Sequence, residues 1–334
     1  MKILIATDAW LPQTNGVVNT LRHTSEALRC AGHEVLLVTP QLFRTVACPS
    51  YPEIRLSLMP GATVAAQLDG FQPDAIHIAT EGPIGFAMRR ACRERGLRFT
   101  TSYHTQFPEY LRSRAPVPLA LSYAALRRFH GRAARCMVST PTMQARLESR
   151  GFANIVRWQR GVDTQLFRPR SKDFLDLPRP LAVYVGRVSV EKNLDAFMAM
   201  EWQGGKLVVG DGPDRARLQA LHPQVSFAGY RFGEDLAAHL AAADIMVFPS
   251  LTDTFGLVNL EAMACGVPVA AFPVAGPIDV IEDGVTGALD ADLAAAARRA
   301  LGVDPRACRE RALRADWNAS TRQFESNLVD CRAA

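Results

Sequence analysis

Short apolar segments alternate with helical stretches along the chain, and this alternation runs through both halves. In the first half, KILIA, EVLLVT, DAIHIA and RFTTSYH are rich in apolar and β-branched residues, and each predicts a buried strand. In the second half, LAVYVG, KLVVG, VSFAG, DIMVFPS and VPVAAF have the same character and are separated by helical stretches. Such alternation is typical of mostly parallel sheets covered by helices. The sequence therefore predicts an α/β protein with two units of this kind.

The length and the joint between the halves fit two domains. The chain has 334 residues, of which 48% are hydrophobic, enough to fill two cores. Residues 160–180 contain three prolines, several charges and no long periodic pattern, which is typical of a joint. We therefore place the first domain at residues 1–165 and the second at residues 166–317. A last helix, at about Ser320 to Leu328, can pack on either domain.

Cysteine usage and hydropathy indicate a cytoplasmic protein. The seven cysteines stand alone, with no CxxC pair, so we expect reduced thiols and no zinc site. The apolar run at the N-terminus is too short for a signal peptide, and the chain has no run of 18 apolar residues that would span a membrane.

The charge is distributed unevenly between the halves. Residues 1–165 hold 20 Lys and Arg against 11 Asp and Glu, a surplus of +9, whereas residues 166–334 hold 18 against 22, or −4. The basic half fits a polyanionic or membrane-surface partner. Ordinary solvation of an arginine-rich composition is an equal alternative.

Polar residues follow the predicted strands where ligands bind in open parallel sheets. Such ligands lie beyond the carboxyl ends of the strands, and between two such domains the expected site is the cleft that separates them. Five residues occupy these positions: Gly16 after the first strand, His104 after RFTTSY, Arg187 after VYVG, Lys192 at the next helix, and Asp253 after MVFPS.

Arg187 and Lys192 belong to VGRVSVEKN, a strand-to-helix loop. Two cations beside the free amides of a helix start suit a diphosphate, and a solvated surface pair is the alternative. The nearby VGDGPD lacks the third glycine that a nicotinamide-binding loop needs. DAD at residues 290–292 imitates a metal-binding motif, but a helix N-cap is the simpler interpretation.

The segment SLTDTFGLVNLEAMACGVPV, residues 250–269, holds two carboxylates, Asp253 and Glu261. Gly256 lies where a helix should begin and Gly266 suits its end, so Asp253 precedes the helix and Glu261 lies inside it. This layout suits an elongated ligand such as a nucleotide sugar, which has hydroxyl groups on both sides of a diphosphate. The alternatives are an N-terminal helix acid for Asp253 and a solvated helix residue for Glu261.

The stretch DTFGLVNLEAMACGVPV resembles the motif of retaining GT-B glycosyltransferases of family 4, in which seven residues separate two acids. VGRVSVEKN, VGDGP, the NGV after the first strand and HTQFPEY match the same family, in family order. The resemblance implies the GT-B fold: two Rossmann-like domains with parallel sheets facing a central cleft, and a tail helix, at about 318–334, that returns to the N-terminal domain. It also implies transfer of a hexose from a nucleotide diphosphate sugar, with anomeric retention, no cofactor and no metal ion.

The resemblance further implies roles for single residues. On the donor side, Gly16 would approach the diphosphate through its backbone, Arg187 and Lys192 would hold the phosphates, and Glu261 would bind the ribose beside Phe255, Gly256 and Leu257. Asp253 would bind the sugar hydroxyls and His104 would line the sugar pocket, although His104 can instead be a buried core histidine. The family has Glu at position 253; the shorter Asp leaves the donor open between GDP-mannose and a UDP-hexose.

The segment Tyr110 to Leu147 holds no acid and seven arginines, at positions 112, 114, 127, 128, 132, 135 and 146. Leu119 to Arg135 is predicted to be a basic amphipathic helix, with Arg127 and Arg128 on the acceptor or membrane side. Family members with the HTQFPEY segment often glycosylate lipids, so the resemblance favours a lipid acceptor and a peripheral place on the cytoplasmic membrane face. An internal helix whose arginines line the cleft is the alternative.

Two other functions share these features. A sugar-nucleotide epimerase can have the same architecture, and a non-catalytic binding module would keep the fold. The complete set of two cations and two acids favours transfer to a lipid or saccharide hydroxyl. We expect no nucleic-acid partner.

Overall fold

The computed structural model describes residues 1–13, 15–48, 51–112 and 116–333. The chain divides into two compact units: Met1–Gln159 with Trp317–Ala334, and Arg160–Asp316. Residues 160–165, placed in the first domain from the sequence, belong to the second unit. Arg114, one of the seven arginines, lies outside the described residues.

The first unit is built on a parallel six-stranded sheet in the order β2-β1-β5-β6-β7-β8. Its strands are β1 (Lys2–Ala6), β2 (Glu34–Val38), β5 (Ala75–Ile78), β6 (Thr100–Ser102), β7 (Arg135–Val138) and β8 (Ile155–Arg157), and β3 (Thr45–Cys48) pairs with β4 (Tyr51–Ser57) in an antiparallel hairpin. Its helices are α1 (Gly16–Cys30), α2 (Gly61–Phe71), α3 (Pro83–Glu94), α4 (Phe107–Arg112), α5 (Leu119–His130), α6 (Pro141–Glu148) and α14 (Trp317–Asn327), with a 3₁₀ helix η1 (Pro40–Leu42).

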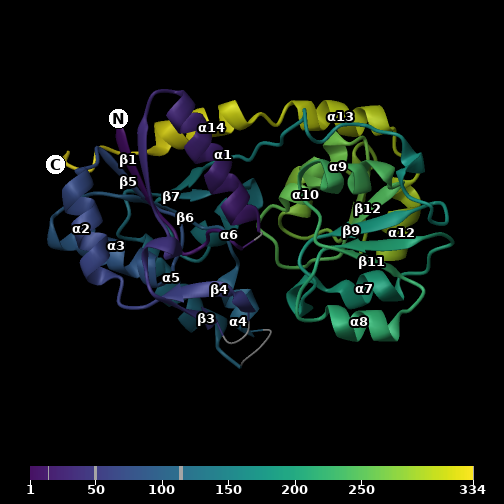
Figure 1. The fold of residues 1–334 in the computed structure, drawn as a ribbon, viewed down its shortest axis with the longest axis horizontal. Helices are drawn as coiled ribbons and strands as arrows, with labels where there is room; N and C mark the ends of the chain where they lie inside the picture. The colour runs from purple at the N-terminus through teal and green to yellow at the C-terminus, as the bar shows by residue number, and fades with distance from the viewer. Residues whose placement is uncertain (14, 49–50, 113–115, 334) are drawn as a thin grey trace. The chain divides into compact units, whose positions relative to one another are not determined.

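Strand β1 shows how this sheet is covered on both faces. Successive strand residues point to opposite faces: Leu4 packs in one core cluster and Ile3 and Ile5 pack in another, all fully buried. The tail helix α14, yellow in Figure 1, packs beside α1. There Trp317 stacks on His23, with ring centroids 4.8 Å apart.

The second unit repeats the scheme with a parallel sheet in the order β11-β10-β9-β12-β13-β14. Its strands are β9 (Ala182–Val185), β10 (Lys206–Val209), β11 (Ser226–Gly229), β12 (Ile245–Phe248), β13 (Val269–Ala271) and β14 (Gly287–Leu289). Its helices are α7 (Leu194–Ala199), α8 (Arg215–Leu221), α9 (Gly233–Ala242), α10 (Leu257–Ala264), α11 (Pro277–Val280), α12 (Leu293–Ala300) and α13 (Pro305–Leu313), with 3₁₀ helices η2 (Lys172–Phe174) and η3 (Val190–Lys192).

The structure tests several local predictions. The nine predicted strands are confirmed, and so is the N-cap in DAD, where the Asp292 carboxylate accepts a hydrogen bond from the Ala294 amide at 2.9 Å. The helix predicted over Leu119–Arg135 is too long, because α5 ends at His130 and Arg135 already begins β7. None of the described helices is both long and apolar enough to cross a bilayer.

Candidate functional site

The sheet of the second unit has a topological switch point between β9 and β12. From β9 the chain adds β10 and then β11 on one side of the sheet, and it later places β12 on the other side of β9. Ligands of open α/β sheets bind at such a point, beyond the carboxyl ends of the strands. Arg187 and Lys192 follow β9 and Asp253 follows β12, so three of the predicted residues lie at this switch point.

The loop that carries Arg187 is held by the glycines of VGDGP. A Cβ on Gly210 would lie 1.9 Å from the Gly186 carbonyl oxygen, and one on Gly212 would lie 2.3 Å from the Val188 carbonyl oxygen. The Arg187 carbonyl also accepts a hydrogen bond from the Tyr184 hydroxyl at 2.8 Å. These glycines therefore act by letting two loops pack closely, which fixes the backbone at Arg187.

Lys192 and Asp253 form an ion pair across the switch point. The Lys192 Nζ lies 2.7 Å and 2.9 Å from the two carboxylate oxygens of Asp253, and the two side chains are only 20% and 17% exposed. Asn193, with φ 55°, separates η3 from α7, and its side chain donates to the Pro249 carbonyl at 3.1 Å. The sequence assigned Lys192 and Asp253 to different parts of the ligand and did not predict this pair.

Glu261 is a half-buried acid on α10. No hydrogen bond or ion pair joins its carboxylate to another described residue, and burial raises the pKa of the Glu261 carboxyl to about 7. Gly256 caps the helix at φ 80°, while Phe255 and Leu257 beside it are partly buried. An acid that has no partner among the described residues is suited to accept hydrogen bonds from ligand hydroxyls.

Further polar groups around the switch point have no hydrogen-bond partner among the described residues. Ser250 and Asn259 are fully buried, yet their side-chain polar atoms make no hydrogen bond within the described chain, nor do those of Ser189 and Thr252. Buried polar groups are normally hydrogen-bonded, so a polar ligand or ordered water would complete this set. Sequence analysis missed Asn259, although an asparagine among the apolar residues of LVNLEAMA is a detectable signal.

The first unit places Gly16 and His104 at the carboxyl edge of its own sheet. Gly16 opens α1, where the Asn15 side chain caps the helix by accepting from the amides of Val17 and Val18, each at 3.0 Å. His104 follows β6, and its Nε2 lies 2.8 Å from the Ser102 Oγ. The structure therefore positions both residues at strand ends, as expected, but in a different unit from Lys192 and Asp253.

Two buried groups that the sequence did not reveal organise the loop after β5. The Asp8 carboxylate accepts hydrogen bonds from the amides of Ile84 and Gly85 at the start of α3, at 2.8 Å and 3.2 Å, and burial raises its pKa. His130 lies 2.9 Å from the Glu81 carboxylate. Burial opposes its charge, but Cys136 and Glu81 outweigh this and raise the pKa of His130 to about 10.

The predicted acceptor-side arginines lie on α5. Arg127 and Arg128 are both exposed, and the Arg127 Nη1 donates to the Arg150 carbonyl at 2.9 Å. Leu121, on the same helix, is 66% exposed. Helix α5 thus presents basic and apolar side chains together.

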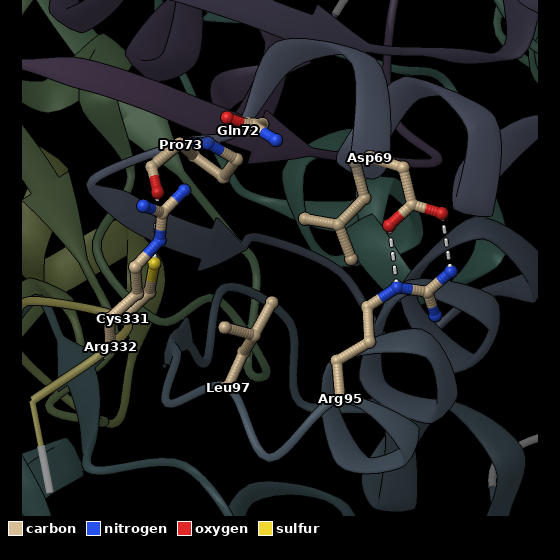
Figure 2. Close-up of a pocket in the computed structure, with 8 residues that line it drawn as sticks. Asp69, Gln72, Pro73, Arg95, Leu97, Cys331 and Arg332 are labelled. Carbon is tan, nitrogen blue, oxygen red and sulfur yellow. Dashed lines mark hydrogen bonds and ion pairs between the residues drawn. The ribbon is translucent and has the colours of Figure 1, made fainter.

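A hollow of about 200 Å³ near the C-terminus is not a second candidate site. Figure 2 shows that Arg95, which lines it, forms a forked pair with Asp69, with both N–O distances 2.7 Å. Pro73 and Leu97 place this hollow at the amino edge of β5 and β6, away from the edge where ligands bind in such sheets. Within the described residues, no group of three or more His, Cys, Asp or Glu side chains could hold a metal ion.

Both halves of the chain match known glycosyltransferase domains. Residues 14–166 match the model of glycosyltransferase family 4, and residues 179–302 match that of glycosyl transferases group 1. The chain is 33% identical over 316 residues to a GDP-mannose-dependent alpha-mannosyltransferase of Mycobacterium tuberculosis, covering 86% of this chain and 83% of that protein. It is 28% identical over 313 residues to a GDP-mannose-dependent alpha-(1-6)-phosphatidylinositol dimannoside mannosyltransferase of the same organism, covering 84% and 82%.

A solved structure shares the fold. Sucrose-phosphate synthase from Thermosynechococcus elongatus superposes with a TM-score of 0.77 at 23% identity, covering 97% of each chain. With two parallel-sheet units, a switch-point site in the second and this set of relatives, the chain belongs to the GT-B glycosyltransferases of the family 4 type.

Proposed function

We propose that this glycosyltransferase transfers mannose from GDP-mannose to a hydroxyl group of a lipid acceptor, with retention of the anomeric configuration and without a metal ion. The switch-point arrangement carries the proposal: Arg187 and Lys192 follow β9, Lys192 pairs with Asp253 after β12, and Glu261 lies on the helix that follows. The choice of GDP-mannose is supported by the names of the two mycobacterial relatives. A UDP-hexose is the competing donor.

The proposed chemistry is direct front-face substitution. Negative charge develops on the β-phosphate as the sugar departs, and cations aimed at that charge lower the barrier. In this scheme the Lys192 ammonium, which holds the Asp253 carboxylate, is one of the cations that stabilise this charge. A phosphate oxygen then takes the proton of the attacking hydroxyl.

The donor is tested by ligand-induced stabilisation followed by product analysis. We expect GDP and GDP-mannose to raise the melting temperature more than UDP and UDP-glucose do, and we expect an acceptor-dependent product with an α-linkage in the presence of EDTA. Arg187→Ala or Lys192→Ala should cost about 2–4 kcal/mol of transition-state stabilisation, the scale of losing one oxyanion donor. Isomerised sugar nucleotide without acceptor, or activity that EDTA abolishes, would overturn the proposal.

The lipid acceptor is supported by the basic surface of the first unit. Burial and the neighbouring guanidinium groups of Arg93, Arg128 and Arg132 lower the pKa of Arg89. These positive charges gather near the last turn of α5, and Leu121 in the first turn of the same helix is exposed, a combination that suits the interface of an anionic membrane. We therefore propose that the enzyme docks peripherally on a membrane to reach its acceptor; the vesicle experiment that tests this is given at the end of the Discussion.

A further inference from the structure

A second hollow of the first unit is lined by three arginines. It measures about 210 Å³ and lies near the C-terminal ends of α3 and α5, and its lining consists of Arg89, Arg93, Gly96, Leu97, Phe99 and Arg132. Phe99 directly precedes β6, so this hollow lies at the amino edge of that strand, whereas His104 follows the carboxyl end of β6. The hollow is therefore separate from the strand end at which we place His104.

The charge of this hollow differs from that of the hollow in Figure 2. Both include Leu97, but in Figure 2 the Arg95 guanidinium is neutralised by its forked pair with Asp69. Around Arg89, by contrast, the charged groups that shift its pKa are all guanidinium groups: those of Arg93, Arg128 and Arg132. Within the described residues, none of these four arginines forms an ion pair with an acid.

Backbone carbonyls and an aromatic ring hold Arg89 in one orientation. Its Nε donates to the Phe129 carbonyl at 3.1 Å and its Nη2 to the Arg128 carbonyl at 2.9 Å, and the guanidinium lies over the Phe129 ring, 5.8 Å from the centroid. A guanidinium has five N–H groups, so three remain for a ligand after these two bonds.

The same bonds offset only part of the positive charge. Arg89 meets carbonyls at the C-terminal end of α5, where a cation is favourable. The side chains of Arg93 and Arg132 are exposed and make no hydrogen bond within the part of the chain that the structure describes. Guanidinium groups this close repel one another, and an anion between them would replace repulsion with attraction. Phosphate matches the planar fork of arginine in geometry and binds it through charge-assisted hydrogen bonds.

An exposed aromatic residue beside Arg89 favours a lipid as the source of the phosphate. Phe86 precedes Arg89 by three residues on α3, so both lie on one face of the helix. Phe86 packs edge-on against the same Phe129 ring, with centroids 4.9 Å apart, and is nevertheless 54% exposed. A free phosphate ion makes no use of such a ring, whereas proteins at a membrane interface place aromatic side chains at the acyl boundary and cations at the headgroups.

We propose that this hollow binds the phosphate group of an anionic membrane lipid through Arg89, Arg93 and Arg132, with Phe86 against the acyl chains. The proposal rests on the membrane docking proposed above and deepens it, because it names the lipid group that is bound and the residues that bind it. It requires neither the sugar donor nor the transfer reaction.

NMR of the full chain with a soluble lipid tests the hollow without a membrane. The ligand is dihexanoyl phosphatidylglycerol below its critical micelle concentration, and the Arg89 Nε–H signal is the one missing from Arg89→Lys. We expect a saturable shift of this signal, with affinity about 10-fold or more lower in Arg93→Gln/Arg132→Gln. Arg98→Gln/Arg322→Gln is the matched control, because it removes two exposed arginines of the same unit that do not line the hollow. No saturable shift, or an equal loss in both double variants, would overturn the proposal.

The source of the phosphate is tested with two further ligands at constant ionic strength. Glycerophosphoglycerol is the same headgroup without acyl chains, and inorganic phosphate is the free anion. We expect both to shift the Arg89 signal with lower affinity than the lipid, and we expect Phe86→Ser to weaken binding of the lipid alone. Tighter binding of inorganic phosphate than of the lipid, or the same loss for all three ligands in Phe86→Ser, would overturn the assignment to a lipid.

Vesicle binding separates this proposal from the docking on which it rests. Arg93→Gln/Arg132→Gln should bind vesicles that contain phosphatidylglycerol about 10-fold or more weakly than the wild type does, whereas Arg98→Gln/Arg322→Gln should bind them normally. Vesicle binding that both double variants retain would refute the role of the hollow and leave peripheral docking in place. Absence of vesicle binding by the wild type would refute docking itself and the lipid site with it.

Discussion

The protonation state of the Glu261 carboxyl group, which lies in the candidate site, affects the stability of the folded chain. Burial raises its pKa from the ordinary 4.5 to about 7 in the folded chain. Between these two values the unfolded chain has already lost the proton that the folded chain keeps, so the free energy of unfolding falls as pH rises from about 4.5 to about 7. Above pH 7 the folded chain bears the full free-energy cost of keeping this buried carboxyl group ionised.

Replacing this acid with its neutral analogue should therefore stabilise the protein at high pH. We expect Glu261→Gln to raise the free energy of unfolding by about 2–3 kcal/mol at pH 8 and by less than about 1 kcal/mol at pH 5, measured by urea unfolding without ligand. Glu310→Gln, a change at an exposed acid on α13, is the matched control for the substitution itself. The same gain for Glu261→Gln at both pH values would contradict the prediction.

Asp253 and Glu261 should differ in kinetics because they lie at different points of the site. Glu261→Ala removes a contact that ground and transition states share in our scheme, so we expect KM for the donor to rise about 10- to 100-fold with a smaller change in kcat. Asp253→Ala removes the partner that orients Lys192, and we expect kcat to fall about 100-fold. Steady-state rates with varied donor distinguish the two; the opposite split would reverse our placement of the donor.

At the scale of elements, the start of α10 depends on Gly256. Its φ of 80° disfavours any residue with a Cβ, and an added Cβ would lie 2.6 Å from the Asn259 Nδ2 and 2.9 Å from the Phe248 Cζ. Gly284 has a similar φ of 76° but no atom near its Cβ position. Comparing the two glycines therefore separates backbone strain from steric crowding of an added Cβ. We expect Gly284→Ala to cost about 1–2 kcal/mol through backbone strain alone, and Gly256→Ala to cost about 1–3 kcal/mol more through crowding.

Thermal or urea unfolding of the two alanine variants measures this difference. Gly256→Ala should also weaken nucleotide binding, because the crowded side chain of Asn259 lies at the switch point. Equal destabilisation by the two substitutions, with nucleotide binding intact in both, would contradict the prediction. It would mean that the start of α10 accommodates a Cβ at position 256 without crowding.

The order of strands and helices along the chain was predictable from the sequence, because most strands consist of apolar and β-branched residues, as in KILIA and DIMVFPS. Strand β7 was not, because its first residue, Arg135, continues an arginine-rich helical pattern whose one interruption is Gly131. Parallel strands end at one edge of the sheet, so the sequence could place Lys192 and Asp253 at strand ends. It could not predict their pairing, which joins residues 61 apart in the chain, or the left-handed backbone of Asn193, which follows Lys192.

At the scale of the whole molecule, the two units differ in charge. The first unit holds 21 Lys and Arg against 12 Asp and Glu, a net charge of +9, and the second unit holds 17 against 21, a net charge of −4. Each cation near an anionic bilayer contributes about 1 kcal/mol of attraction, and this attraction is screened by salt. Docking through the first unit should therefore depend on the arginines of that unit rather than on the net charge of the protein.

Vesicle co-sedimentation tests this docking with two variants of equal charge change. Since the Arg127 side chain supports the Arg150 carbonyl, we place the substitutions at Arg128 and at Arg132, which follows α5. We expect wild-type binding to phosphatidylcholine vesicles to rise with added phosphatidylglycerol, to fall with salt, and to weaken about 10-fold or more in Arg128→Glu/Arg132→Glu. Arg306→Glu/Arg314→Glu, at exposed positions of the second unit, changes the net charge equally and should bind as the wild type does. Equal binding to neutral and anionic vesicles, or none to either, would refute electrostatic docking and favour a soluble saccharide acceptor.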